Sequence, residues 1–384
     1  MEAYLDNSAT TKVLPQVTEI MAKVHIEDYG NPSALHQKGI EAEKYLNYTR
    51  ETIAAFLGVK EKEIIFTSGG TEANNLAVKG AAKRNRRRGT HLLTTKIEHP
   101  SVLNCFQKLA AEGFEVTYLT VNREGIIDLE ELKHSLRPET LLVSIIHVNN
   151  EVGSIEPVKE AAAIIKEYNE KIIFHVDAIQ SVGRLTIKPA EWGIDLLSMS
   201  AHKLHGPKGA GALYVRSGVL LEPLLDGGGQ ERDLRPGTEN VAAIAGFGKA
   251  VELAAPNIDR QRETLYSLKK NFYAAVKEKI KEVKINGPED EKGAPHIINL
   301  SFPGVKGEVL LHALEGKGVY VSTGSACHSR QSTPSHVLQA LGLKKQEIDS
   351  ALRFSFSILN DGQQIDYAVK ILAEAVNELS RFGH

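Results

Sequence analysis

The sequence predicts an α/β protein whose larger part is a mostly parallel sheet with helices on both faces, followed by a smaller α/β unit. The chain has 384 residues, and a single hydrophobic core stops growing at roughly 250–300 residues. Short apolar runs alternate with segments of helical period, which is typical of strand–helix–strand units. Polar and glycine-rich stretches follow these runs, at the strand ends where parallel sheets bind ligands.

The first part of the chain follows this alternation in order. A segment of helical period over 13–25 precedes an amphipathic helix over 40–57, which ends at Gly58. A strand at 63–66 runs into a Gly-Gly turn that opens a helix at Thr71, and residues 98–101 cap a helix over 102–111. A buried-type strand over 171–176 ends at Asp177. Further strand and helix segments are predicted at 91–95, 114–121, 129–135, 140–148, 157–168, 195–197 and 210–215.

The second part begins after a glycine-rich loop and a helix that ends at residue 254. The loop covers 226–240, a length that is usually functional or disordered. Pro256 marks a boundary, and residues 258–281 predict one long helix. Strands at 297–302, 319–322 and 352–357 then alternate with helices at 308–315, 335–341 and 365–382.

Composition excludes several classes of protein. The formal net charge is −2, so neither nucleic acid nor an anionic membrane is an expected partner. No apolar run approaches the ~18 residues of a membrane-spanning helix. Residues 1–30 contain no apolar signal-peptide block, so we expect a cytoplasmic protein. Two widely spaced cysteines in such a chain do not indicate a disulfide framework.

Lys203 lies on a tight connection between two strand-like runs. Ser200, His202 and His205 are expected to crowd around it, and the turn at 206–209 fixes the chain behind it. A lysine amine in a partly desolvated polar pocket has a lowered pKa and can attack a carbonyl to form a Schiff base. A lone lysine is more often a surface residue, so the neighbouring motifs decide between the two interpretations.

Those motifs fall at the ends of the predicted strands. The Gly-rich turn at 68–71 offers the N–H groups of a helix start and two hydroxyls, which suit an anion, although a simple helix cap is the alternative. His99, Asn150 and Asp177 follow other strands. Because ligands bind beyond the carboxyl ends of parallel strands, these groups and Lys203 are predicted to converge.

The two cysteines have different surroundings. Cys105 lies among Leu103, Phe106 and Leu109, which predicts a core residue. Cys327 lies among small and polar residues beside His328 and Arg330, which favour the reactive thiolate, although an incidental loop cysteine is the alternative.

Taken together, these residues resemble the pyridoxal-phosphate-dependent cysteine desulfurases (NifS/IscS-like), within the class V aminotransferases. The resemblance covers the whole chain and rests on motifs in the family's order, at 5–11, 29–33, 67–72, 98–99, 149–153, 175–180, 200–209, 227–232, 237–240, 325–327 and 352–355. It implies the transferase fold of type I, with a seven-stranded-type sheet in a large cofactor-binding domain at 13–255. Residues 1–12 and 256–384 would form a small domain that carries a mobile cysteine loop at about 322–334.

The resemblance also implies a role for each site residue. Lys203 forms the Schiff base with the cofactor, Asp177 pairs with its pyridine nitrogen, and Cys327 accepts the sulfur. His99 stacks on the ring and moves protons. The other implied contacts are Gln180 with the ring hydroxyl, Gly70, Thr71, Ser200 and His202 with the phosphate, Thr238 with the phosphate of the neighbouring subunit, and Asn150 and Arg353 with the substrate carboxylate, Asn150 also touching the cofactor.

The implied activity is removal of sulfur from L-cysteine, leaving L-alanine and a persulfide on Cys327. A homodimer without a metal is implied, and an iron–sulfur scaffold, a tRNA-thiolation protein or another sulfur carrier would receive the sulfur. Alternatives are a selenocysteine lyase, another class V aminotransferase, or a non-enzymatic sulfur-trafficking scaffold. Three positions depart from the common pattern: Gly70 replaces alanine, Pro236 replaces serine and His328 replaces threonine.

Overall fold

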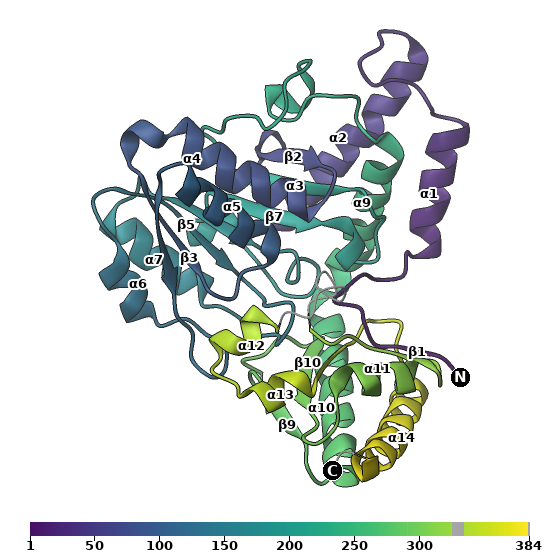
Figure 1. Ribbon diagram of the computed structural model, residues 1–384. Coiled ribbons are helices and arrows are strands. Elements are labelled where there is room, and N and C mark those ends of the chain that lie inside the picture. Colours follow the sequence, from purple (N-terminus) through teal and green to yellow (C-terminus); the bar gives the residue numbers. More distant parts are fainter. Residues whose placement is uncertain (290, 325–333, 383–384) are drawn as a thin grey trace.

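The computed structural model describes residues 1–289, 291–324 and 334–382, so Cys327 and its neighbours lie outside the described part of the chain. Figure 1 shows an upper body around one sheet and a lower body that carries the N-terminal strand β1 (Ala3–Tyr4) and the helix α14 (Gly362–Leu379). Among the described helices, none is both long and apolar enough to cross a membrane.

The upper body is built on a seven-stranded sheet, mostly parallel as predicted. Neighbouring strands from β4 to β7 run parallel, whereas β8 is antiparallel to both β7 and β2. Every residue of the five strands β3 and β5 to β8 is buried, and such strands need cover on both faces. The order across the sheet is β2 (Ile64–Thr67), β8 (Gly211–Val215), β7 (Leu196–Ser200), β6 (Ile173–Asp177), β5 (Thr140–Ile146), β3 (His91–Thr95) and β4 (Glu115–Leu119).

Helices supply this cover, as the alternating pattern predicts. One face packs against α1 (Pro15–Ile26), α2 (Gln37–Leu57), α6 (Leu129–Ser135), α7 (Val158–Tyr168) and α9 (Val241–Ala254). The other face packs against a continuous run of α3 (Gly70–Asn75), the π-helix η2 (Leu76–Gly80) and α4 (Ala81–Arg84), and against α5 (Pro100–Ala111). A short helix, α8 (Pro189–Trp192), precedes β7.

The lower body has its own hydrophobic core. Its three-stranded sheet is antiparallel, with β10 (Ile297–Ser301) between β12 (Ala351–Ser355) and β9 (Lys284–Asn286), and β1 pairs in parallel with β11 (Val319–Tyr320). Its helices are α10 (Ile258–Lys279), α11 (Gly307–Glu315), α12 (His336–Ala340), α13 (Lys345–Asp349) and α14.

The sequence does not predict β9 or α13, because elements of three and five residues are too short to show a period. The predicted boundary at residue 255 falls between α9 and α10. The division into two domains stays a prediction.

A buried acid near β5 gives a testable pH dependence. Burial raises the pKa of Glu156 to about 8, and its Oε2 accepts a hydrogen bond from Ile127 N at 2.9 Å. Below that pH the folded chain keeps a proton that the unfolded chain has released. Stability therefore falls as pH rises from about 5 to about 8, by up to about 1.4 kcal/mol per unit.

We expect Glu156→Gln to remove this loss, so that the variant gains stability relative to the parent across the same pH range in urea unfolding. Glu160→Gln, an exposed change on α7, should leave the pH dependence of stability as in the parent. Parallel stability curves for parent and Glu156→Gln would contradict the expectation.

Candidate active site

The predicted residues meet in one pocket beyond the carboxyl ends of the parallel strands. The cavity measures about 200 Å³, and ten predicted site residues line it. They come from six separate stretches of chain, which agrees with the rule that open α/β sheets bind ligands at this edge. The ten are Gly70, Thr71, His99, Asn150, Asp177, Gln180, Ser200, His202, Lys203 and Arg353.

Lys203 ends the 3-10 turn η4 (Ala201–Lys203), directly after β7. Its Nζ donates to the backbone carbonyl of Ala9 at 2.8 Å and to that of Ser8. Both acceptors belong to the N-terminal segment, so the start of the chain forms one wall of the pocket. The sequence does not predict this contact, because it joins segments 194 residues apart.

His205 does not line the larger pocket. Its Nδ1 lies 2.8 Å from Lys12 O, and it lines a smaller neighbouring cavity together with Lys203. Its backbone is left-handed, with φ of 64°, so the chain turns sharply after Lys203 and carries the imidazole away.

Asp177 ends β6 and is 2% exposed. Burial raises its pKa, while hydrogen bonds from Ile179 N and Asn74, and the charge of Lys203, oppose the rise. Asn74 Nδ2 donates to Oδ2 at 2.8 Å, and Ile179 N donates to Oδ1 at 3.0 Å. A buried carboxylate held by neutral donors suits a ligand that brings a positive N–H group.

Asn74 also connects Asp177 with His99. Its Nδ2 donates to Ser101 Oγ at 2.9 Å, and that hydroxyl lies 2.8 Å from His99 Nδ1. Ser101 N donates to the same Nδ1 at 3.1 Å, so this nitrogen is an acceptor and Nε2 carries the proton of the neutral ring. The sequence analysis misses Asn74 and Ser101, although Asn74 follows Gly70 by one helical turn and so shares its face.

The opposite end of the pocket suits an anion. Gly70 begins α3, and a Cβ there would overlap with Ile179 Cδ1, so the helix start approaches the pocket closely. Ser200 Oγ is buried and has no hydrogen-bond partner among the described residues. Burial, followed by the charges of Lys203, Lys208 and Arg184, lowers the pKa of His202 to about 4, so its ring is a neutral hydrogen-bonding group near pH 7.

Arg353 projects from β12 of the lower body and is 1% exposed. It donates to Asp6 Oδ1 at 2.7 Å and to the carbonyl of Asn150 at 2.9 Å. Its Nε is buried without a hydrogen-bond partner among the described residues. A planar guanidinium with a donor to spare suits a carboxylate.

Gln180 also lines the pocket. Its Nε2 donates to the carbonyl of Ser8 at 3.0 Å, and its Oε1 lies 3.4 Å from His296 Nε2. These two contacts hold the amide between the N-terminal segment and the start of β10.

Two predicted residues lie elsewhere. Thr238 is exposed and does not line the pocket. Cys327 lies outside the described residues, but both flanks of its segment meet at the buried Glu151. Ser335 Oγ donates to Glu151 Oε2 at 2.5 Å, and a Cβ on Gly324 would lie 3.2 Å from the same oxygen.

Cys105 lies in the core, as predicted. It is 2% exposed, and burial raises its pKa to about 11. Its thiol is therefore neutral near pH 7 and cannot act as a nucleophile there.

Comparison with known proteins yields matches over nearly the full chain. The sequence model of the family described as aminotransferase class-V matches residues 3–368. A protein named cysteine desulfurase IscS, from Clostridium botulinum, is 45% identical over 378 residues, which cover 98% of this chain and 95% of the relative. A solved structure titled NifS-like protein superposes with a TM-score of 0.93 at 38% identity, over 98% of this chain and 100% of the other. Another, titled SspA in complex with cysteine, gives 0.83 at 37% identity, over 92% and 99%.

Proposed function

The chain belongs to the aminotransferase class-V family and is a pyridoxal-phosphate-dependent cysteine desulfurase, and from this premise we propose which residues carry the reaction and where the sulfur goes. The observation that supports the assignment best is the convergence of Lys203, Asp177 and Arg353 on one buried pocket. An amine, a buried carboxylate and a guanidinium are the groups needed to hold an aldehyde, a ring nitrogen and an amino-acid carboxylate.

The residues present fit the cofactor. The unpartnered Ser200 Oγ, with Gly70, Thr71 and the neutral His202 lining the same pocket, would hold its phosphate. Asp177 would pair with the ring nitrogen and Gln180 with the ring hydroxyl, since both line the same pocket. When bound, pyridoxal phosphate supplies an aldehyde that captures amines and a ring that stores the electron pair released at the substrate carbon.

The chain's own residues then have separate tasks. Lys203 would hold the cofactor through Nζ, and with L-cysteine bound its free amine would be the base that takes the proton from the substrate α-carbon. Arg353 and Asn150 orient the substrate carboxylate, and His99, fixed by Ser101, moves protons at the ring through Nε2. The Cys327 thiolate would attack the substrate sulfur, and the carbon–sulfur bond would break with its electron pair going to carbon. That carbon then takes up a proton from water, so the products are alanine and a persulfide on Cys327.

The direct test uses protein purified with its cofactor. Incubation with L-cysteine and a thiol reductant should release alanine and sulfide in equal amounts, without a keto acid as acceptor. A strict requirement for a keto acid would indicate a transaminase, and turnover of L-selenocysteine alone would indicate a selenocysteine lyase. Either outcome would contradict the proposed reaction.

Arg353 gives a sharper prediction on substrate recognition. We expect Arg353→Met to raise KM for L-cysteine about 100-fold, because a charge-assisted bidentate contact to the carboxylate is lost. L-cysteine methyl ester, which lacks that carboxylate charge, should be a poor substrate for the parent and should lose no further activity in the variant. An equal loss on both substrates would assign Arg353 to structure through Asp6 and Asn150.

We further propose that the protein acts as a homodimer in which Thr238 reaches the cofactor phosphate of the neighbouring subunit. Thr238 is exposed on its own chain. The apolar side chains of Ile26, Tyr29 and Leu35 are 75%, 69% and 97% exposed, and exposed apolar side chains are typical of surfaces that pack against another subunit. Molar mass by light scattering, with Leu35→Asp as the disrupting variant, tests the association.

The route of the sulfur beyond Cys327 belongs to the same proposal. We assign the protein to the cytoplasm, where reducing conditions keep its thiols free. The acceptor is an iron–sulfur scaffold or a tRNA-thiolation protein. Mixing the persulfide-bearing enzyme with each candidate and following the labelled sulfur distinguishes them.

A further inference from the structure

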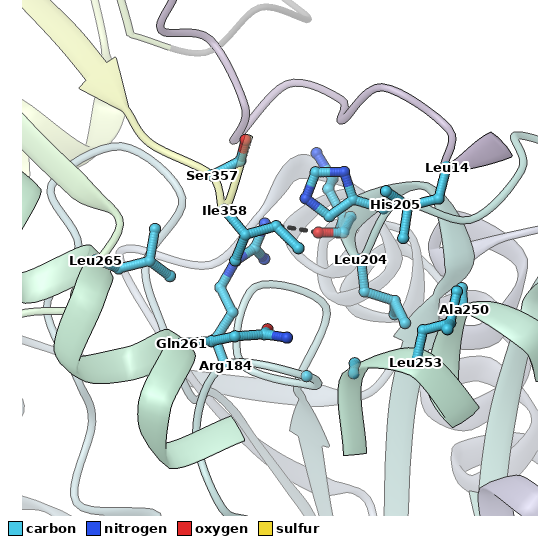
Figure 2. Close-up of a pocket in the computed structure, with 13 residues that line it drawn as sticks. Leu14, Arg184, Leu204, His205, Ala250, Leu253, Gln261, Leu265, Ser357 and Ile358 are labelled. Atoms are coloured by element: carbon cyan, nitrogen blue, oxygen red, sulfur yellow. Dashed lines mark hydrogen bonds between the residues drawn. The ribbon is translucent and has the colours of Figure 1, made fainter. Parts of the chain in front are cut away.

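Arg184 is a buried cation directly behind the pocket lysine. It is 6% exposed and lies seven residues after Asp177, on the segment that also carries Gln180. A cavity of about 40 Å³ adjoins it and is lined in part by Lys203, Leu204 and His205. Figure 2 shows Arg184 among the residues that line this cavity, with Ile358 over its guanidinium and Gln261 below.

The guanidinium joins two residues that line the cofactor pocket. Nη2 donates to the backbone carbonyl of Lys203 at 2.6 Å, and Nη1 donates to that of Gln180 at 3.4 Å. Among the described residues, no carboxylate forms an ion pair with Arg184. Burial lowers its pKa to about 10, so it is protonated near pH 7.

A buried charge without a counter-charge lowers the stability of a fold. Arg353, which is also buried, pairs with Asp6 at 2.7 Å, and the half-buried Arg50 and Lys166 pair with Glu231 at 2.6 Å and with Asp195 at 2.5 Å. Arg184 instead donates hydrogen bonds to the backbone carbonyls of two residues that line the pocket. This arrangement points to a role in positioning the residues of the pocket.

The backbone around Lys203 needs such support. The turn η4 has only three residues, and His205 follows in a left-handed conformation that costs about 1 kcal/mol for a residue with a side chain. Thr11 Oγ1 donates to the carbonyl of His202 at 2.9 Å, and Arg184 binds the next carbonyl. Without Arg184, the Lys203 carbonyl would lose the side-chain donor that holds it.

The charge also reaches the pocket. Burial is the main cause of the lowered pKa values of His202, His205 and His296, and the positive charge of Arg184 adds to the lowering in all three. A fixed positive charge disfavours a second one nearby. Because Arg184 binds the backbone of Lys203, its charge opposes a further positive charge in the cofactor pocket.

We propose that Arg184 is a positioning residue for Lys203: it clamps the backbone of Lys203 and Gln180 from behind the pocket and sets a fixed positive charge behind the cofactor pocket. This inference rests on the proposed function, because its readouts need the cofactor bound to Lys203.

Three variants of the cofactor-bound enzyme test it. Arg184→Met removes the charge and both hydrogen bonds at similar length, and Arg184→Lys keeps the charge. Lys166→Met is the control, since it removes a half-buried cation at the opposite, amino ends of the strands. The measurements are cofactor release, the pH titration of the cofactor absorbance, and KM for L-cysteine.

We expect Arg184→Met to release the cofactor at least about tenfold faster, because charge-assisted hydrogen bonds are lost. The midpoint of its absorbance titration should move to higher pH, and KM should stay as in the parent because Arg353 is untouched. Arg184→Lys should restore the midpoint and still release the cofactor faster. Lys166→Met should change only thermal stability.

Parental release rates and an unshifted midpoint in both Arg184 variants would overturn the inference and leave Arg184 a purely structural residue. If Arg184→Met does not fold, the rate of cofactor release from Arg184→Lys tests the inference. Release faster than in the parent supports the backbone clamp, and release at the parental rate overturns it. A parent protein that binds no cofactor would overturn the proposed function and this inference together.

Discussion

Replacement of Lys203 by alanine is expected to abolish turnover of L-cysteine, with a loss of at least about 10⁴-fold, because one amine both holds the cofactor and moves the substrate proton. The variant should also lack covalently held cofactor. Visible absorbance after extensive dialysis, together with single-turnover release of alanine, measures both effects. The expectation follows from the position of Nζ in the pocket that Asp177 and Arg353 also line.

Lys208→Ala is the matched control, because that lysine is exposed five positions further along the same connection. It should retain cofactor and activity. If Lys203→Ala kept the visible band through dialysis, the assignment of the reactive amine would be wrong. Added alkylamines that restore part of the turnover would show that only the amine is missing.

The position of the pocket could be predicted because it depends on local patterns. The strands before His99 and Asn150 are short buried runs that end four residues before these side chains, and Asp177 ends its own buried strand. Parallel strands bring their carboxyl ends to one edge, so the sequence places these side chains together without any knowledge of distances. The core assignment of Cys105 succeeded for a similar reason, since its helix neighbours are apolar.

The parts that could not be predicted depend on contacts distant in sequence. Ser8 and Ala9 form a wall of the pocket, and Arg184 binds the backbone of Lys203. Neither contact can be predicted from the sequence pattern of the segments that it joins. The division of the space around Lys203 into two cavities, with His205 in the smaller one, follows from a left-handed backbone at a non-glycine residue, which has no signal in the sequence. Asn74 was missed because its amide acts through Asp177 and Ser101 on groups already assigned.

The two cysteines give the second large effect. We expect Cys327→Ala to lower sulfide release from L-cysteine by at least about 10³-fold, because no other thiolate is available to accept the sulfur. The variant should still bind L-cysteine and should still change the cofactor absorbance when it does, since Lys203, Asp177 and Arg353 are intact. Mass spectrometry of the parent should find one added sulfur atom on the peptide that contains residue 327.

Cys105→Ala is the matched control, and its outcome separates two explanations. The Cys105 thiol is 2% exposed, its pKa is about 11, and its Sγ donates to the carbonyl of Ser101 at 3.0 Å inside α5. It therefore has neither the charge nor the access to receive sulfur, and its loss should leave sulfide release as in the parent. The flanks of residue 327 instead meet at Glu151, next to Asn150, whose carbonyl binds Arg353 at the substrate end of the pocket. Sulfide release by Cys327→Ala at the parental rate would mean that sulfur leaves L-cysteine without a protein thiol, and the enzyme would then be a lyase.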